Sequence, residues 1–231
     1  MIEAPESAFE SSGARRFKAA LGAGELHIIA GLFDLQGGPG KRLDATDLRP
    51  IVQLLGERGS IGAIASSLLE RPARPVRALL LDKSPAANWR LGWHQDRTIA
   101  VQERIELDGF GPWSTKAGQL HVQPPHWITD RMVTLRLHVD TVDDANGPLR
   151  VLPGSHLLGQ LSSEAVENLA STTAPLTCLA DAGDVWAYRT AIVHASAEQL
   201  CPGRRRVLQL DYSADSLPGG LRWASLIAEL D

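Results

Sequence analysis

The second half of the chain alternates apolar and polar residues with the two-residue period of β-strands. Within Met132–Asp140 every odd-numbered position holds valine or leucine, whereas the even-numbered side includes Thr134, Arg136 and His138. Further strands are predicted at Val76–Leu81, Asp184–His194 and Arg205–Tyr212, with turns at Asn146-Gly147, Pro153-Gly154 and Pro202-Gly203. The chain from about residue 75 onward is therefore predicted to be rich in strands.

The first third of the chain carries helical patterns instead. Residues 44–47 predict the cap of a helix over 48–55, and Ser60 predicts the cap of a second helix over 61–69. The apolar, glycine-containing stretch 14–35 predicts a helix followed by a loop, and 37–40 a further loop. A short helix is expected at 164–169. Strands with turns, preceded by helices that can cover one sheet face, favour a sandwich or small barrel with helices.

Composition narrows the classes of protein that this pattern allows. The chain has 231 residues, of which 44% are hydrophobic and 22% charged, values typical of a soluble globular protein. A formal net charge of −4 provides no basic field for nucleic acid, and the apolar runs are too short to cross a bilayer. Cys178 and Cys201 predict no disulfide framework, and no signal peptide is visible, so we expect a cytoplasmic protein without nucleic-acid or membrane partners. The oligomeric state is left open.

Two histidines and a carboxylate are the first candidates for chemistry. His94 and Asp96 lie two residues apart, so on a strand both side chains would point the same way. Taken alone, this pair is as readily a hydrogen-bonded histidine and aspartate, and His194 alone is as readily a core histidine. Together the three residues match the ligand set of a non-haem Fe(II) facial triad, which leaves coordination positions open for co-substrates.

A run of three arginines follows His194 at Arg204, Arg205 and Arg206. Strand parity separates them, because Arg205 shares its face with Gln209, whereas the opposite face carries apolar residues suited to packing against helices. Arg205 is thus the arginine expected to face an internal ligand, where its planar fork can bind a carboxylate with two hydrogen bonds.

These elements lie within five short motifs in a fixed order. They are Asp82-Lys83-Ser84-Pro85 with Asn88-Trp89, Gly92-Trp93-His94-Gln95-Asp96, His121-Val122-Gln123-Pro124-Pro125, the segment 147–156, and His194-Ala195-Ser196 with Arg205. In this order and spacing the chain resembles the phytanoyl-CoA dioxygenase family of iron- and 2-oxoglutarate-dependent oxygenases, and its small bacterial members in particular. The resemblance runs from about Pro75 to Tyr212, and the first 70 residues carry no motif that we can place.

The resemblance implies a role for each matching residue. His94, Asp96 and His194 match the iron ligands, and Arg205 matches the residue that binds the distal carboxylate of 2-oxoglutarate. Gln95 and Ser196 fall at positions that hydrogen-bond this co-substrate, and Leu79 and Arg136 align with the pocket wall. Our interpretation of the remaining polar and aromatic residues adds Gln123, Trp93 and Trp113 to the pocket, with His121 an equal alternative to Gln123.

The family fold is a double-stranded β-helix, or jelly roll, with helices packed outside its larger sheet. We therefore expect one domain over 1–231, with a helical part at 1–72 and a jelly-roll core at 75–213. The leading hypothesis is an Fe(II)- and 2-oxoglutarate-dependent dioxygenase that uses O2 to hydroxylate a small molecule, such as an amino-acid derivative or secondary metabolite, releasing succinate and CO2. The alternatives are desaturation, cyclisation or epimerisation at the same iron, or a jelly-roll module that binds a ligand without turnover.

Overall fold

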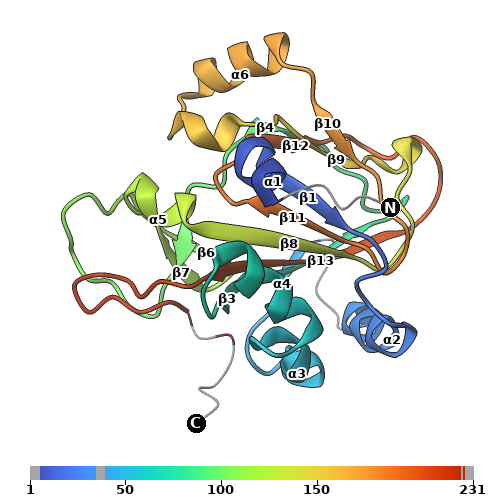
Figure 1. Ribbon diagram of the computed structural model, residues 1–231, viewed down its shortest axis with the longest axis horizontal. Coiled ribbons are helices and arrows are strands. Elements are labelled where there is room, and N and C mark those ends of the chain that lie inside the picture. The colour runs from blue at the N-terminus through green and yellow to red at the C-terminus, as the bar shows by residue number, and fades with distance from the viewer. Residues whose placement is uncertain (1–5, 35–39, 225, 227–231) are drawn as a thin grey trace.

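Two antiparallel sheets face each other in the core of the molecule. The computed structural model describes residues 6–34, 40–224 and 226. The larger sheet has the order β1-β11-β8-β13-β3-β2 and the smaller sheet the order β10-β9-β12-β4 (Figure 1). Neighbouring strands are far apart in the sequence, which is the arrangement of a double-stranded β-helix. The predicted fold class is confirmed.

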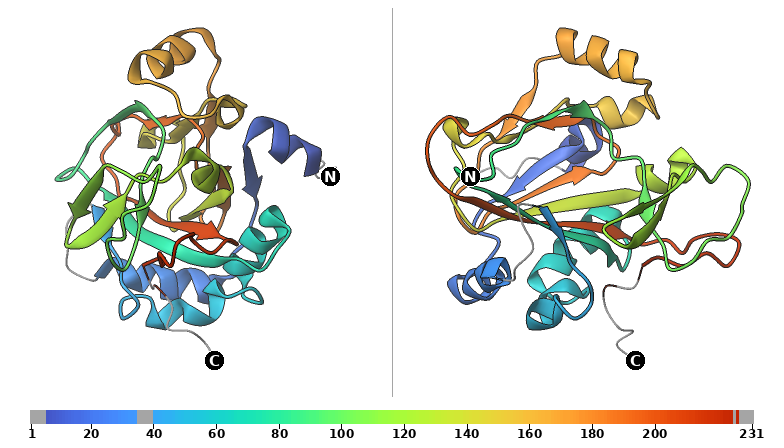
Figure 2. Two further views of the ribbon diagram at one scale, coloured as in Figure 1. Left: turned by 90° about the vertical axis from the view of Figure 1, so that its left-hand side faces the viewer. Right: turned by 180° about the vertical axis from the view of Figure 1, so that it is seen from behind.

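The strands of the larger sheet are β1 (Ala14–Phe17), β2 (Gly40–Arg42), β3 (Arg74–Lys83), β8 (Met132–His138), β11 (Val185–Arg189) and β13 (Arg205–Ser213). Those of the smaller sheet are β4 (Leu91–His94), β9 (Leu149–Val151), β10 (Leu176–Cys178) and β12 (His194–Ser196). A third sheet, formed by β5 (Ile99–Ala100), β6 (Trp113–Lys116) and β7 (Gln119–Val122), stands with α5 (His126–Asp130) at one end of the two main sheets (Figures 1 and 2).

Helices cover the outer face of the larger sheet. They are α2 (Ala23–Gly31), η1 (Leu32–Asp34), η2 (Arg49–Ile51), α3 (Val52–Leu55) and α4 (Ser60–Leu69), and α1 (Glu6–Ser12) precedes β1. Leu208, Leu210 and Tyr212 of β13 are buried in one cluster with apolar residues of these helices. The hydroxyl of Tyr212 donates to the carbonyl of Leu55 at 3.1 Å, which satisfies its one buried polar atom. The even-numbered face of this strand therefore packs on helices, as predicted.

The opposite face of the larger sheet, which faces the smaller sheet, carries polar side chains on β3, β8 and β13. Gln209 pairs with Leu79 on one side and with Arg136 on the other, so their side chains share one row of the inner face. Arg205 lies two rows away and pairs with Lys83. Leu79, Arg136, Arg205 and Gln209 line a cavity between the two sheets.

Three predictions for the N-terminal third are corrected. Residues 14–17 form β1, not a helix, because they pair with β11 from Ala14↔Tyr188 to Phe17↔Val185, and the helix α2 begins only at Ala23. Ser60 is the first residue of α4 rather than its cap; Gly59 is the cap, where a Cβ atom would lie 2.4 Å from the carbonyl oxygen of Gln53. Of the loop predicted at 37–40, residues 37–39 lie outside the described residues, and Gly40 begins β2.

The strand predicted at Asp184–His194 is two strands in different sheets. β11 ends at Arg189, where the amide of Ile192 donates to the carbonyl of Arg189 at 2.9 Å and closes a turn. Thr190 within this turn is held by a hydroxyl contact of 3.0 Å with Thr134. The turn transfers the chain to the smaller sheet, so that β12 begins at His194.

The remaining helices lie on or beside the smaller sheet. The predicted helix at 164–169 is α6 (Ser163–Thr172), whose cap Ser162 accepts a hydrogen bond from the amide of Ala165 at 3.1 Å. Single turns occur at η3 (Asp144–Asn146) and η4 (Ser155–Leu158). None of the helices in the described part of the chain combines the length and apolar character that crossing a bilayer requires.

Candidate metal and co-substrate site

Three potential metal ligands converge on the inner side of the smaller sheet. His94 at the end of β4 pairs with His194 at the start of β12, and their ring centroids lie 4.2 Å apart. Asp96 lies two residues beyond the end of β4, so it is not on the strand, in contrast to the prediction. One donor atom from each of the three side chains lies within 4.8 Å of the other two. The sequence-predicted set is thus brought together in space.

Backbone carbonyls orient both imidazole rings. Nδ1 of His94 lies 2.8 Å from the carbonyl oxygen of Gly92, and Nδ1 of His194 lies 3.0 Å from that of Ile192. A proton on each Nδ1 leaves the Nε2 lone pair free, which is the arrangement of a metal-binding histidine. Burial lowers the pKa of His194 to about 4, so this ring is neutral at physiological pH. The donor set therefore fits a divalent metal such as Fe(II).

An arginine on the facing sheet holds the carboxylate of Asp96. Nη2 of Arg77 lies 2.6 Å from Oδ2 of Asp96, and Nε of Arg77 lies 2.5 Å from Oδ2 of Asp211. Burial alone would raise the pKa of Asp96, but the charges of Arg77, His194 and His94 bring it below its usual range. Burial raises the pKa of Asp211, which also accepts a hydrogen bond of 3.0 Å from Thr134. Asp96 is therefore an anion with one oxygen left for a metal.

A cavity of about 220 Å³ adjoins these residues between the sheets. Seven residues predicted for the site line it: the three potential metal ligands and Leu79, Arg136, Ser196 and Arg205. Its lining includes five arginines and lysines, namely Arg42, Arg77, Lys116, Arg136 and Arg205, but Asp96 is the one acidic residue among the described residues that line it. The cavity is therefore suited to anions.

Two buried arginines, Arg136 and Arg205, line one end of the cavity, and the buried Lys83 pairs with Arg205 on the neighbouring strand. Arg205 is 2% exposed, and its Nη1 donates to the carbonyl of Gly147, while its Nε has no hydrogen-bond partner among the described residues. Lys83 is 0% exposed; its Nζ donates to the carbonyl of Ala197 and lies 3.4 Å from the hydroxyl of Ser196. Burial lowers the pKa of Arg205 to about 9 and that of Lys83 to about 7, and the charge of Arg136 adds to both shifts. A bound carboxylate would compensate these charges.

Several residues predicted for the pocket lie elsewhere. The amide of Gln95 is fully engaged: Nε2 donates to the carbonyls of Gly159 and Ala191 at 3.0 and 2.8 Å, and Oε1 accepts from the amide of Leu161 at 2.9 Å. These three bonds connect Gln95 to the segments around Gly159, Leu161 and Ala191, and Gln95 does not line the cavity.

His121 and Gln123, the two candidates of the 121–125 motif, do not line the cavity. The two predicted tryptophans, Trp93 and Trp113, do not line it either. Trp93 packs in the cluster that includes Val166 of α6, under the guanidinium of Arg150 at 5.2 Å. Trp113 packs in the cluster around β5 and β7. The tryptophan that does line the cavity is Trp89, which the prediction did not single out.

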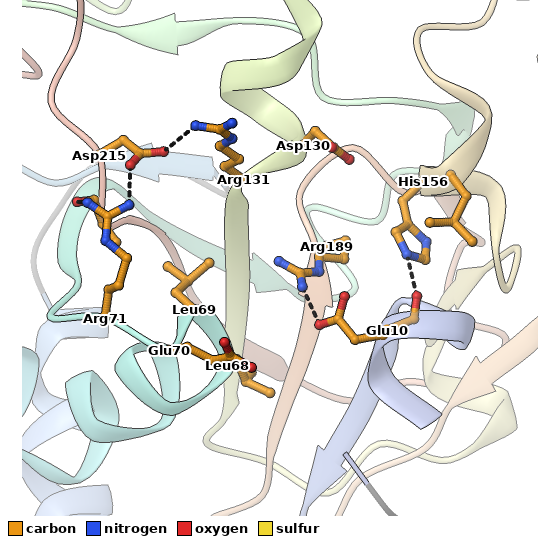
Figure 3. Close-up of a pocket in the computed structure, with 12 residues that line it drawn as sticks. Glu10, Leu68, Leu69, Glu70, Arg71, Asp130, Arg131, His156, Arg189 and Asp215 are labelled. Atoms are coloured by element: carbon orange, nitrogen blue, oxygen red, sulfur yellow. Dashed lines mark hydrogen bonds and ion pairs between the residues drawn. The ribbon is translucent and has the colours of Figure 1, made fainter. Parts of the chain in front are cut away.

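A larger cleft, of about 410 Å³, lies away from the metal ligands and is lined by charged groups that pair with one another. Figure 3 shows Asp215 between Arg71 and Arg131, and Arg189 directed to the carboxylate of Glu10. Nε2 of His156 lies 3.0 Å from the carbonyl oxygen of Glu10, a contact that connects η4 to α1. The three arginines that line this cleft, Arg71, Arg131 and Arg189, are thus each paired with a carboxylate.

Comparison with solved structures shows the same fold in several oxygenases. SnoK, a non-haem α-ketoglutarate-dependent carbocyclase from nogalamycin biosynthesis, is 16% identical with a TM-score of 0.66 over 91% of this chain and 83% of its own. SnoN, the epimerase from that biosynthesis, is 16% identical with a TM-score of 0.64 over 96% and 93%. EctD from S. alaskensis with bound Fe is 16% identical with a TM-score of 0.65 over 90% and 75%, and a second EctD structure holds 2-oxoglutarate and 5-hydroxyectoine.

The family assignment comes from the sequence itself. No curated protein sequence matches the chain. The family model described as phytanoyl-CoA dioxygenase (PhyH) matches residues 44–207, which include His94, Asp96, His194 and Arg205. The chain therefore belongs to the phytanoyl-CoA dioxygenase family, whose members use Fe(II), 2-oxoglutarate and O2.

Proposed function

We propose that the protein is an Fe(II)- and 2-oxoglutarate-dependent hydroxylase of a small organic molecule. The observation that carries this proposal is the convergence of His94, Asp96 and His194 at a cavity whose other end is formed by Arg205. When bound, Fe(II) with 2-oxoglutarate and O2 supplies the oxidising chemistry, in which succinate and CO2 are released as a C–H bond is oxidised. The protein's own residues bind the metal and 2-oxoglutarate, orient them and exclude water from the site.

Orientation of the metal ligands is the first of these tasks. The Nδ1 contacts of both histidines fix the rings with Nε2 toward the metal, and Arg77 fixes the plane of the Asp96 carboxylate. Such supporting contacts set ligand orientation and basicity. Two histidines and one carboxylate cover one face of a metal, so the opposite face is left for the co-substrates.

Binding of 2-oxoglutarate is assigned to the cationic end of the cavity. The fork of Arg205 can hold the distal carboxylate, and the hydroxyl of Ser196 and the ammonium of Lys83 add donors beside it. Leu79 and Arg136 complete the wall on the larger sheet. Because these donors are buried, they are stronger partners than the same groups in water.

We propose further that residues 1–231 form one domain, with 1–72 supplying the helices and both edge strands of the larger sheet. Cys178 is buried and Cys201 exposed, and both are free thiols, which suits a reducing compartment and a cytoplasmic enzyme.

The test is an assay for succinate with Fe(II), 2-oxoglutarate, ascorbate and a library of small metabolites, with product masses measured. Hydroxylation adds the mass of one oxygen atom, desaturation or ring formation removes two hydrogens, and epimerisation leaves the mass unchanged. SnoK and SnoN carry out the latter kinds of reaction on the same fold, so the mass decides among outcomes. Binding of metal and 2-oxoglutarate without succinate from any compound would favour the non-catalytic binding module.

A further inference from the structure

A second group of cationic side chains lines the same cavity, away from Arg205. Arg42 of β2 and Lys116 of β6 come from two different sheets and both line the cavity. Nη1 of Arg42 is buried without a hydrogen-bond partner among the described residues. Nζ of Lys116 donates to the hydroxyl of Thr98 at 2.8 Å, a neutral partner. Two positive charges thus line the cavity, and neither forms an ion pair with a carboxylate in the described part of the chain.

The nearby carboxylates are already engaged. Arg77 lies between Asp96 and Asp211, at 2.6 and 2.5 Å. Asp96 has its remaining oxygen committed to the metal in the proposed function. Burial lowers the pKa of Lys116, and the positive charges of Arg42 and Arg77 lower it further, so repulsion among these cations exceeds the attraction of Asp96. An additional anion would relieve that repulsion.

This group is separate from the cations assigned to 2-oxoglutarate. Arg42 pairs with Leu79, Leu79 with Gln209, and Gln209 with Arg136, so three strand spacings, or about 14 Å, separate the backbones of Arg42 and Arg136. The charges that shift the pKa of Arg42 are those of Arg77, Asp96 and Asp211. The charge that shifts the pKa of Arg205 is that of Arg136. One end of the cavity therefore suits one acid group, and the edge at β2 and β6 suits another.

We infer that Arg42 and Lys116 bind a carboxylate of the substrate, so that the enzyme acts on a small organic acid. The inference rests on the proposed function, in which the two acid groups of 2-oxoglutarate lie at the metal and at Arg205, leaving Arg42 and Lys116 for the substrate. The arginine fork and the lysine ammonium supply charge-assisted donors that match carboxylate oxygens. A neutral amide of the same shape offers no compensating charge and leaves both cations unpaired.

The experiment uses small acids and their amides as probes. The full-length protein is loaded with Zn(II), which accepts the same ligands without redox chemistry, and with saturating 2-oxoglutarate. Acetate, propionate and benzoate are then titrated against acetamide, propionamide and benzamide at constant ionic strength, with binding followed by protein NMR. We expect at least one acid to bind tenfold or more tightly than its amide. Arg42→Gln and Lys116→Met should each weaken that acid tenfold or more and leave the amides unchanged.

Matched controls use exposed cations that do not line the cavity, Arg58→Gln and Lys18→Met, which should bind the acids as the wild type does. Affinity for 2-oxoglutarate should stay within threefold in Arg42→Gln and Lys116→Met, which also shows that both variants are folded. Acids that bind no more tightly than amides, or equally in all four variants, would overturn the inference. A tenfold loss of 2-oxoglutarate affinity in Arg42→Gln would also overturn it. A wild-type protein that binds neither Zn(II) nor 2-oxoglutarate would instead refute the proposed function.

Discussion

Arg77 lies 2.6 Å from Asp96 and connects the carboxylate predicted to bind metal to the buried Asp211 of the facing sheet. The three side chains form a closed arrangement of two anions around one cation. It couples the loop after β4 to the interior strands β3 and β13, so the position of Asp96 depends on the larger sheet as well as on its own loop.

Replacing Arg77 is therefore expected to damage both stability and metal binding. In Arg77→Leu two buried carboxylates lose their partner, which costs about 3–5 kcal/mol of folding free energy. Loss of such a supporting contact weakens metal affinity about 10–100-fold. Thermal unfolding and anaerobic Fe(II) titration measure the two effects.

Asp211→Asn separates the two roles of Arg77. This variant keeps the contact between Arg77 and Asp96, so metal affinity should remain closer to the wild type than in Arg77→Leu, although stability falls. The exposed Arg58→Gln serves as the control. Equal metal affinity in Arg77→Leu and in the wild type would show that Arg77 does not position Asp96.

The metal ligands themselves give a spectroscopic prediction. Anaerobic Fe(II) with 2-oxoglutarate should give a weak visible charge-transfer band that disappears in His94→Ala and in His194→Ala. Asp96→Gly should abolish hydroxylation, because the carboxylates of Asp211 and Asp140 are already engaged, the first with Arg77 and the second with Arg206 at 2.7 Å. A normal band in both histidine variants, or full hydroxylation by Asp96→Gly, would mean that other residues hold the iron.

The sequence was sufficient to predict which side chains of a single strand share a face, and the structure agrees with that prediction for β13. Alternation on β13 placed Arg205 on the buried inner face, and the neighbouring arginines are indeed partnered elsewhere, Arg204 with Asp82 and Arg206 with Asp140. Parity does not extend to Gln95, which follows the end of β4 and whose side chain is held by Gly159, Ala191 and Leu161.

Residues that depend on pairing between distant strands were not predictable. Val76–Leu81 is so apolar that its sequence does not reveal which face is internal, and only its pairing with β13 directs Arg77 and Lys83 inward. The turn that ends β11 likewise depends on Thr190 meeting Thr134 of another strand. Long-range contacts of this kind override local propensity.

The lowered pKa of Lys83 predicts how 2-oxoglutarate binding depends on pH. Its pKa in the folded protein is lowered by burial, Arg205 and Arg136 to about 7, below the 10.5 of a free lysine. Between these values the unfolded chain holds a proton on Lys83 that the folded chain has lost. The free energy of unfolding therefore rises with pH from about 7 to 10.5 on account of Lys83. An anion bound beside Lys83 favours its charged form, so 2-oxoglutarate binding should take up a proton above pH 7.

Affinity for 2-oxoglutarate should accordingly fall as pH rises from 7 to 9, by at most about tenfold per pH unit. Calorimetry in buffers of different ionisation enthalpy measures the proton uptake directly. Lys83→Met should bind 2-oxoglutarate less tightly at pH 7 but with a flatter pH profile. The same slope in Lys83→Met and in the wild type would assign the proton to another group.

The last prediction distinguishes three adjacent arginines. Arg205 is buried at the end of the cavity, whereas Arg204 and Arg206 lie on the other face and pair with Asp82 and Asp140. Removing the buried arginine leaves a desolvated carboxylate unpaired and costs about 2–5 kcal/mol of binding free energy. Arg205→Leu should therefore weaken 2-oxoglutarate binding roughly 30-fold to several thousand-fold.

Arg204→Leu and Arg206→Leu break partly exposed ion pairs worth about 0–1 kcal/mol of stability and should leave 2-oxoglutarate binding within about threefold. Titration of 2-oxoglutarate against succinate formation compares all three variants. A large effect at Arg204 or Arg206 with none at Arg205 would mean that the co-substrate binds on the other side of β13.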